Sequence, residues 1–130
     1  MAKPRGQTTQ LHNMYVADFE TCDSDRLYKV DKTTGMPIYY QRVWLAGHKN
    51  LKTMESKYFN SLDDFMKDIL GRGNNTHREY AFHNLKFDGS FILPWLFENG
   101  YEVVQGKPQP GQFSVLVDDR NNWYNITIQV

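Results

Sequence analysis

Cysteine, long apolar runs and net charge are all scarce or missing in this sequence of 130 residues. The single cysteine, Cys22, cannot form a disulfide within the chain, which suits a reducing cytosol. The longest apolar stretch, Phe91 to Phe97, is interrupted by Pro94 and is far too short to span a bilayer. Residues 1–12 are polar and lack the apolar segment of a secretion signal. We therefore expect neither secretion nor membrane insertion.

Charge of one sign is not in excess, because fifteen Lys and Arg residues balance fifteen Asp and Glu residues. A protein that coats nucleic acid through charge alone would carry a positive excess, so the sequence argues against that class. It does not argue against a nuclease, whose site needs carboxylates to hold metal ions. Apolar residues make up 40% of the chain, which is enough for a packed core and predicts one domain or a large piece of one.

Polar turns divide residues 13–130 into short apolar segments, whereas residues 1–12 are expected to form a flexible arm. We expect an antiparallel meander of strands at residues 13–19, 42–48 and 53–59, with a strand at 79–82 beside the first of them. The pattern further predicts a polar, turn-rich connection at 22–40, helices at 61–70 and 87–99, and strands at 101–105, 113–118 and 123–129. This order predicts an α/β domain with one main mixed sheet and flanking helices.

Two acidic residues follow the first apolar segment directly, in the order Asp18-Phe19-Glu20-Thr21. Residues two apart on a strand face the same side, so the Asp18 and Glu20 carboxylates should lie together while Phe19 points into the core. Paired carboxylates on a rigid strand suit the hard cations Mg²⁺ and Mn²⁺, which clamp the oxygens of a phosphodiester during hydrolysis. An Asp-x-Glu motif is common by chance, however, and a solvated strand end is the simpler interpretation of this motif alone.

A second block, residues 80–91, runs from a predicted strand into a predicted helix. The free N–H groups at a helix start favour an anionic ligand, but Asp88 could simply cap the helix and Asn84 could be a turn residue. His83 could be a structural histidine and Phe87 a core aromatic, although proteins that bind single strands do stack bases on aromatic rings.

The octapeptide at residues 82–89, Phe-His-Asn-Leu-Lys-Phe-Asp-Gly, resembles the second exonuclease motif of protein-primed family B DNA polymerases of small tailed phages. Asp18-Phe19-Glu20-Thr21 resembles the first exonuclease motif of the same family, and the order and spacing of the two motifs also fit. Residues 97–101 and 122–124 resemble the family as well, so the resemblance covers most of residues 13–130.

This resemblance implies part of a ribonuclease-H-like (DnaQ-like) exonuclease fold at residues 13–130. It implies that Asp18 and Glu20 bind the catalytic Mg²⁺ or Mn²⁺ ions and that Asp88 holds the second metal site through water. The implied reaction removes 3′-terminal nucleotides from single-stranded DNA by two-metal catalysis. The side chains that would touch these nucleotides are Thr21, His83, Asn84 and Phe87. The implied partners are a single-stranded DNA 3′ end, the remainder of a polymerase and a terminal protein primer, in the cytoplasm of a bacterial host.

The third exonuclease motif of the family, Tyr-x-x-x-Asp, does not occur in the sequence, which ends at Val130. We therefore expect the 130-residue chain alone to be a very poor nuclease at best and to bind Mg²⁺ or Mn²⁺ weakly. Asp118 and Asp119 are the late carboxylates that could replace the missing ligand. The chain is either part of a longer polymerase or a short protein that kept half of the domain. An alternative from another class is an inactive module that binds single-stranded DNA or another protein.

Overall fold

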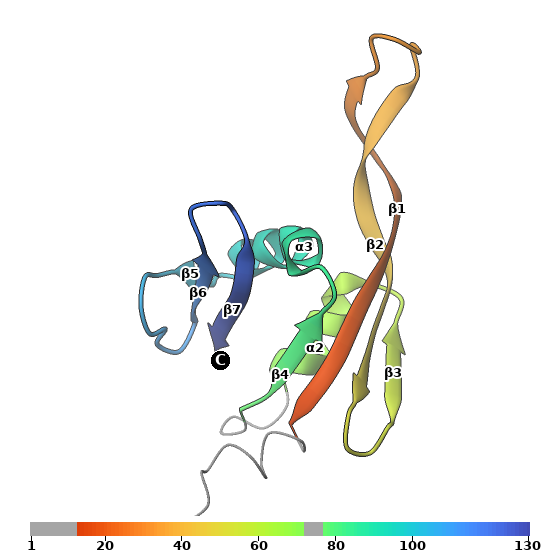
Figure 1. Cartoon of the computed structure of the whole chain (residues 1–130). Coiled ribbons are helices and arrows are strands. Elements are labelled where there is room, and N and C mark those ends of the chain that lie inside the picture. Colours follow the sequence, from red (N-terminus) through yellow and green to blue (C-terminus); the bar gives the residue numbers. More distant parts are fainter. Residues whose placement is uncertain (1–12, 72–76) are drawn as a thin grey trace, which may run out of the picture.

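A computed structural model describes residues 13–71 and 77–130, which form two β-sheets with helices packed between and beside them (Figure 1). The elements in chain order are β1 (Met14–Val30), β2 (Pro37–Asn50), β3 (Ser56–Phe59), α2 (Leu62–Gly71), β4 (Glu79–Phe82), α3 (Leu85–Glu98), β5 (Glu102–Val103), β6 (Gln112–Val117) and β7 (Trp123–Gln129). The N-terminal arm predicted at residues 1–12 lies outside the described residues. No helix within the described ranges is long and apolar enough to cross a membrane.

The first sheet has four strands in the order β3-β2-β1-β4. β2 is antiparallel to both β1 and β3, and β4 runs parallel to β1, so the predicted meander and the place of the fourth strand are confirmed. The third strand is shorter than predicted because the chain turns before it. Met54 lies in this turn with a positive φ of 64°, a conformation that a continuing strand does not allow.

Both predicted helices form, and local polar groups fix where they start. The backbone N–H of Asp64 donates a hydrogen bond to the Ser61 Oγ at 3.1 Å, so Ser61 caps α2 at the predicted start of this helix. Helix α3 starts at Leu85, two residues earlier than predicted, because the Asn84 carbonyl accepts the N–H groups of Phe87 and Asp88. This start brings Asp88 into the first turn of α3.

The main core lies between the inner face of the first sheet and the two helices. Phe65 and Met66 of α2 and Leu96 of α3 are fully buried there. The last three strands form a second sheet, in the order β5-β6-β7, instead of extending the first. Phe113 of β6 is fully buried in the same core, so the second sheet packs against the helical layer and completes one hydrophobic unit.

The predicted turn-rich connection at residues 22–40 is wrong for most of its length. The strands β1 and β2 continue through it and form a two-stranded antiparallel arm that projects far beyond the rest of the sheet (Figure 1). A turn at residues 31–36, with Gly35 at a φ of 72°, closes the arm. Side chains that pair across the two strands, such as Tyr28 and Tyr40 with ring centroids 5.1 Å apart, hold the arm without a core.

Candidate functional site

Asp18 and Glu20 lie on the open face of the first sheet, as the two-residue period of a strand predicts. Phe19 between them is 5% exposed and belongs to the core on the opposite face. The strand register sets Gly47 of β2 beside Asp18. A Cβ at Gly47 would come within 2.9 Å of the Tyr58 ring, so this glycine lets the ring of Tyr58 cover β2 next to the carboxylate.

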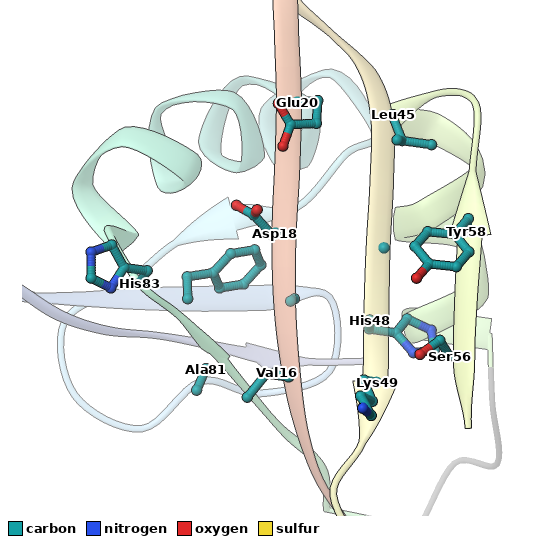
Figure 2. Close-up of a pocket in the computed structure, with 13 residues that line it drawn as sticks. Val16, Asp18, Glu20, Leu45, His48, Lys49, Ser56, Tyr58, Ala81 and His83 are labelled. Atoms are coloured by element: carbon teal, nitrogen blue, oxygen red, sulfur yellow. The ribbon is translucent and has the colours of Figure 1, made fainter. Parts of the chain in front are cut away.

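The open face forms a broad groove of about 800 Å³ that crosses all four strands of the first sheet. Asp18, Glu20 and His83 belong to its lining, and Figure 2 shows the Asp18 carboxylate pointing from β1 toward the side where His83 lies. The other residues that line the groove are Val16, Ala17, Leu45, Gly47, His48, Lys49, Ser56, Tyr58, Ala81 and Phe82. Apart from Ala81 and Phe82, which belong to the block at residues 80–91, the sequence patterns did not single these residues out, because they come from separate strands.

Asp88 is a buried acid in the first turn of α3, with a side chain that is only 3% exposed. Burial raises the pKa of its carboxyl group, and the negative charge of Asp18 raises it further, to about 6. Within residues 13–71 and 77–130, no group donates a hydrogen bond to its carboxylate oxygens. An acid that is buried beside another acid is favoured only when a proton or a cation neutralises it.

Of the three predicted metal ligands, Asp18 is the one that is related in space or by charge to both of the others. Asp18 shares the groove with Glu20, and its charge acts on Asp88. Among the described residues, however, no three His, Cys, Asp or Glu side chains come together as a group that could hold a metal ion. The chemistry of these oxygen donors fits Mg²⁺ or Mn²⁺, but they do not form a closed ligand set. Metal binding by Asp18, Glu20 and Asp88 stays a prediction.

The residues predicted to touch DNA lie around the end of β4 and the start of α3, except for Thr21. Thr21 is half-buried on β1, at the point where the pairing with β2 shifts register. His83 and Asn84 are exposed, and Phe87 is 44% exposed with its ring edge against Phe91. The simpler interpretation of Phe87 as a core aromatic is therefore wrong, whereas its contact with DNA is untested.

Gly89 and Trp123 shape the site, although neither was predicted to do so. A Cβ at Gly89 would lie 3.0 Å from the Trp123 ring and 3.2 Å from the Ile126 side chain. This glycine therefore allows β7 to pack directly on the first turn of α3, beside Asp88. A glycine inside a helix destabilises the helix by about 1 kcal/mol relative to alanine. The presence of a glycine at this position in spite of that cost is the sequence feature that could have indicated a packing role.

Replacing Gly89 by alanine should lower the free energy of unfolding by about 1–3 kcal/mol, because the added methyl group would overpack the contact with Trp123. Urea unfolding measures the difference. Gly71→Ala is the matched control, since a Cβ at Gly71 meets nothing within 4 Å, and it should leave stability unchanged or slightly higher. A Gly89→Ala protein as stable as the Gly71→Ala protein would contradict this account of the packing.

Asp118, one of the two late carboxylates considered as a replacement ligand, is already engaged in its own turn. Its carboxylate accepts hydrogen bonds from the backbone and side chain of Asn122, at 2.9 Å and 3.0 Å, and from the Tyr124 hydroxyl at 2.8 Å. These bonds lower its pKa to about 2. Its role in this structure is to close the turn between β6 and β7.

Comparison with known proteins finds relatives of the chain among phage DNA polymerases, although no protein-family model matches it. The DNA polymerase of Bacillus phage phi29 is 35% identical over 104 residues, which are 79% of this chain and 17% of the polymerase. The DNA polymerase of Streptococcus phage Cp-1 is 29% identical over 126 residues, which are 88% of this chain and 18% of that protein. The chain thus spans less than a fifth of the length of these relatives.

Solved structures of phi29 DNA polymerase give the same result. An orthorhombic crystal form superposes with a TM-score of 0.69 at 32% identity, over 88% of this chain and 17% of the polymerase chain. The phi29 polymerase complexed with single-stranded DNA superposes with a TM-score of 0.68 at 34% identity, over the same shares of both chains. In sequence and in structure, the chain is homologous to the N-terminal region of phi29-type phage DNA polymerases.

Proposed function

We propose that residues 13–130 are part of the 3′→5′ exonuclease domain of a protein-primed family B DNA polymerase, with a ribonuclease-H-like fold. The observation that carries this proposal is the buried Asp88 carboxyl group, which lies near Asp18 and accepts no hydrogen bond from the described residues. A buried carboxylate beside another acid destabilises a protein unless a bound ligand, such as a cation, neutralises its charge. The homology to phage DNA polymerases supports a ligand from phosphoryl-transfer chemistry.

Asp18 and Glu20 would hold the divalent cations, Mg²⁺ or Mn²⁺, and Asp88 would contribute through water. When bound, such ions neutralise charge on the phosphodiester and favour an attacking water at neutral pH. The chain itself supplies rigidity. β1 fixes Asp18 and Glu20 on one face, and the contact between Gly89 and Trp123 fixes the turn that carries Asp88. Positions held this firmly matter because small displacements of a reacting group slow a reaction strongly.

The groove on the open face would receive the 3′-terminal nucleotides of a single strand. His83 lies on its border, and Asn84 follows at the end of β4. The exposed ring of Phe87 offers a surface on which a base can stack. Thr21 would contact the terminal nucleotide from β1. In support, one structural neighbour is a phi29 polymerase complexed with single-stranded DNA.

The whole assembly would include the remainder of the polymerase and a terminal protein primer, and it would act in the bacterial cytoplasm. A second function is favoured by one observation, the lack of any three-ligand metal group among the described residues. In this alternative the chain is a catalytically incomplete module that binds single-stranded DNA or a protein. Metal binding at Asp18 and Glu20 separates the two functions.

The 130-residue chain should bind Mn²⁺ loosely, with a dissociation constant of about 10⁻⁴ to 10⁻³ M, because too few protein ligands leave the ion hydrated. The double variant Asp18→Asn, Glu20→Gln should weaken this binding at least about tenfold, since it removes the charge of two candidate ligands. The electron paramagnetic resonance signal of free Mn²⁺ measures both constants.

A variant with the same change of charge elsewhere serves as the control. Glu98→Gln with Glu102→Gln removes two exposed carboxylates far along the chain from β1 and should bind Mn²⁺ like the unchanged protein. If the double variant at Asp18 and Glu20 binds Mn²⁺ as well as this control does, the proposed metal site is wrong and the incomplete module becomes the better description.

A further inference from the structure

The projecting arm carries two tyrosine rings in contact with each other and a cation against each ring. The guanidinium carbon of Arg26 lies 4.7 Å from the centroid of the Tyr40 ring. The Tyr40 ring meets the Tyr28 ring edge-on at 5.1 Å, and the ammonium of Lys29 lies 5.6 Å from the centroid of Tyr28. We call Arg26, Tyr40, Tyr28 and Lys29 the arm ladder. The ladder therefore combines two positive charges with two rings on one projecting element.

The contacts within the arm ladder help to hold the arm, but they do not explain why two large rings are left in water. The two tyrosines are 56% and 43% exposed, and neither belongs to the core. Exposed contacts between a cation and a ring contribute only about 0.5–1 kcal/mol each, and an isolated two-stranded hairpin is marginally stable. Large aromatic side chains that are left in water on an element without a core indicate a surface for a partner.

Residues 22–40 carry three basic and three acidic side chains, so the attraction of the arm for an anion comes from where its cations lie and not from a net charge. Within the described ranges, neither Arg26 nor Lys29 forms an ion pair. Two nearby acids are engaged locally, since Asp23 accepts a hydrogen bond from Gln41 at 2.7 Å and Asp31 accepts the N–H groups of its own turn. Arg26 and Lys29 thus stay available to a ligand, beside the exposed Asp25.

The arm continues directly from the candidate site. Glu20 and Tyr28 lie on the same strand, and eight residues of extended chain at about 3.3 Å each separate them by about 26 Å. A strand of DNA whose end is held at Asp18 and Glu20 can therefore reach the ladder only if it is several nucleotides long.

We propose that the arm ladder binds single-stranded DNA several nucleotides upstream of the 3′ end held at the carboxylate site. Bases stack on Tyr28 and Tyr40, and Arg26 and Lys29 contact phosphates. Aromatic rings beside cations are the combination by which proteins bind single strands without sequence preference. This inference rests on the proposed function, because it takes the 3′ end to lie in the groove.

The test compares two fluorescein-labelled oligothymidylates, of about four and about fifteen nucleotides, by fluorescence anisotropy on the 130-residue chain. Stacking contributes about 1–3 kcal/mol per base, so the longer strand should bind at least about tenfold more tightly than the shorter one. The double variant Tyr28→Ala, Tyr40→Ala should remove this advantage of length, with about 10- to 100-fold weaker binding of the longer strand. Binding of the shorter strand should not change.

Three control variants define the role of each part. Tyr28→Phe with Tyr40→Phe keeps both rings and should bind the longer strand like the unchanged chain. Arg26→Gln with Lys29→Gln should reduce the slope of log affinity against log salt by about 1.4, since each phosphate contact on a single strand contributes about 0.7. Lys32→Gln with Lys107→Gln removes two positive charges outside the ladder and should leave that slope nearly unchanged.

Several results would overturn the inference. If the Tyr28→Ala, Tyr40→Ala variant binds the longer strand as the unchanged chain does, the ladder has no role and the proposed function still stands. If this variant binds both oligonucleotides more weakly by the same factor, the two tyrosines support the fold of the chain and do not contact the DNA. A preference of the ladder for duplex DNA would refute the commitment to a single strand. If the unchanged chain binds neither oligonucleotide, the proposed function fails as well.

Discussion

Joining this chain to a downstream segment that carries a Tyr-x-x-x-Asp motif should raise its rate of 3′→5′ digestion of single-stranded DNA at least about 100-fold. In the proposed function the chain supplies Asp18, Glu20 and Asp88, but its described residues form no closed metal-ligand group. The added aspartate would complete the ligand set, and the added tyrosine would orient the attacking water. Each preorganised group at the reacting centre contributes about 10²- to 10³-fold to the rate, so the gain should be large.

A strand labelled at its 3′ end, digested in the presence of Mn²⁺, measures this gain. The 130-residue chain alone should cut very slowly, and the extended chain should cut fast. Asp18→Ala with Glu20→Ala in the extended chain should return the rate to background. A short chain that already cuts well, and loses this activity in the double variant, would show that the third motif is dispensable. An extended chain without activity would favour the incomplete binding module.

Replacing Asp88 by asparagine should stabilise the protein by about 2–3 kcal/mol at pH 8 and have little effect at pH 4. The folded-state pKa of Asp88 is raised from 3.8 to about 6, so the folded protein binds a proton there more tightly than the unfolded chain does. The stability that comes from this proton is present below the unfolded-state pKa and is lost as the pH rises through about 6. Each unit of pKa shift corresponds to about 1.4 kcal/mol.

Urea unfolding at pH 4, 6 and 8 tests this dependence, with the exposed Asp119→Asn variant as the control. The difference between the Asp88→Asn protein and the unchanged protein should grow with pH, whereas the control should show no such growth. Saturating Mn²⁺ should reverse the order at pH 8, because the cation neutralises the buried carboxylate only where one is present. An Asp88→Asn protein that is less stable than the unchanged protein at pH 8 would show that a structural role outweighs the electrostatic one.

The local part of the fold could be predicted from the sequence. The alternation of acidic and apolar residues around Phe19 correctly predicted that Asp18 and Glu20 share one face of β1. The predicted start of the helix at residue 61 is where the Ser61 hydroxyl caps α2. These features depend on neighbours within a few residues, where the period of a strand and the chemistry of a helix cap decide the structure. The family resemblance added the homology to phage DNA polymerases, which the comparisons confirm.

The other features depend on contacts between distant segments. The arm looked like a polar loop because Tyr28 and Tyr40 stabilise it only when they meet across two strands. β7 packs on α3 through Trp123 and Gly89, next in the chain to Asp88, and no pattern near Asp88 reveals that contact. The second sheet likewise depends on Phe113 entering the common core.

The position of bound Mn²⁺ tests the central claim most directly. In a titration of the isotope-labelled chain with Mn²⁺, the paramagnetic ion broadens the amide NMR signals of the residues around it. The signals of Asp18, Glu20 and Asp88 should broaden first and recover when Mg²⁺ is added in excess. Broadening centred on Asp118 and Asp119, or on the acids of the arm, with Asp18 and Asp88 unaffected, would contradict it.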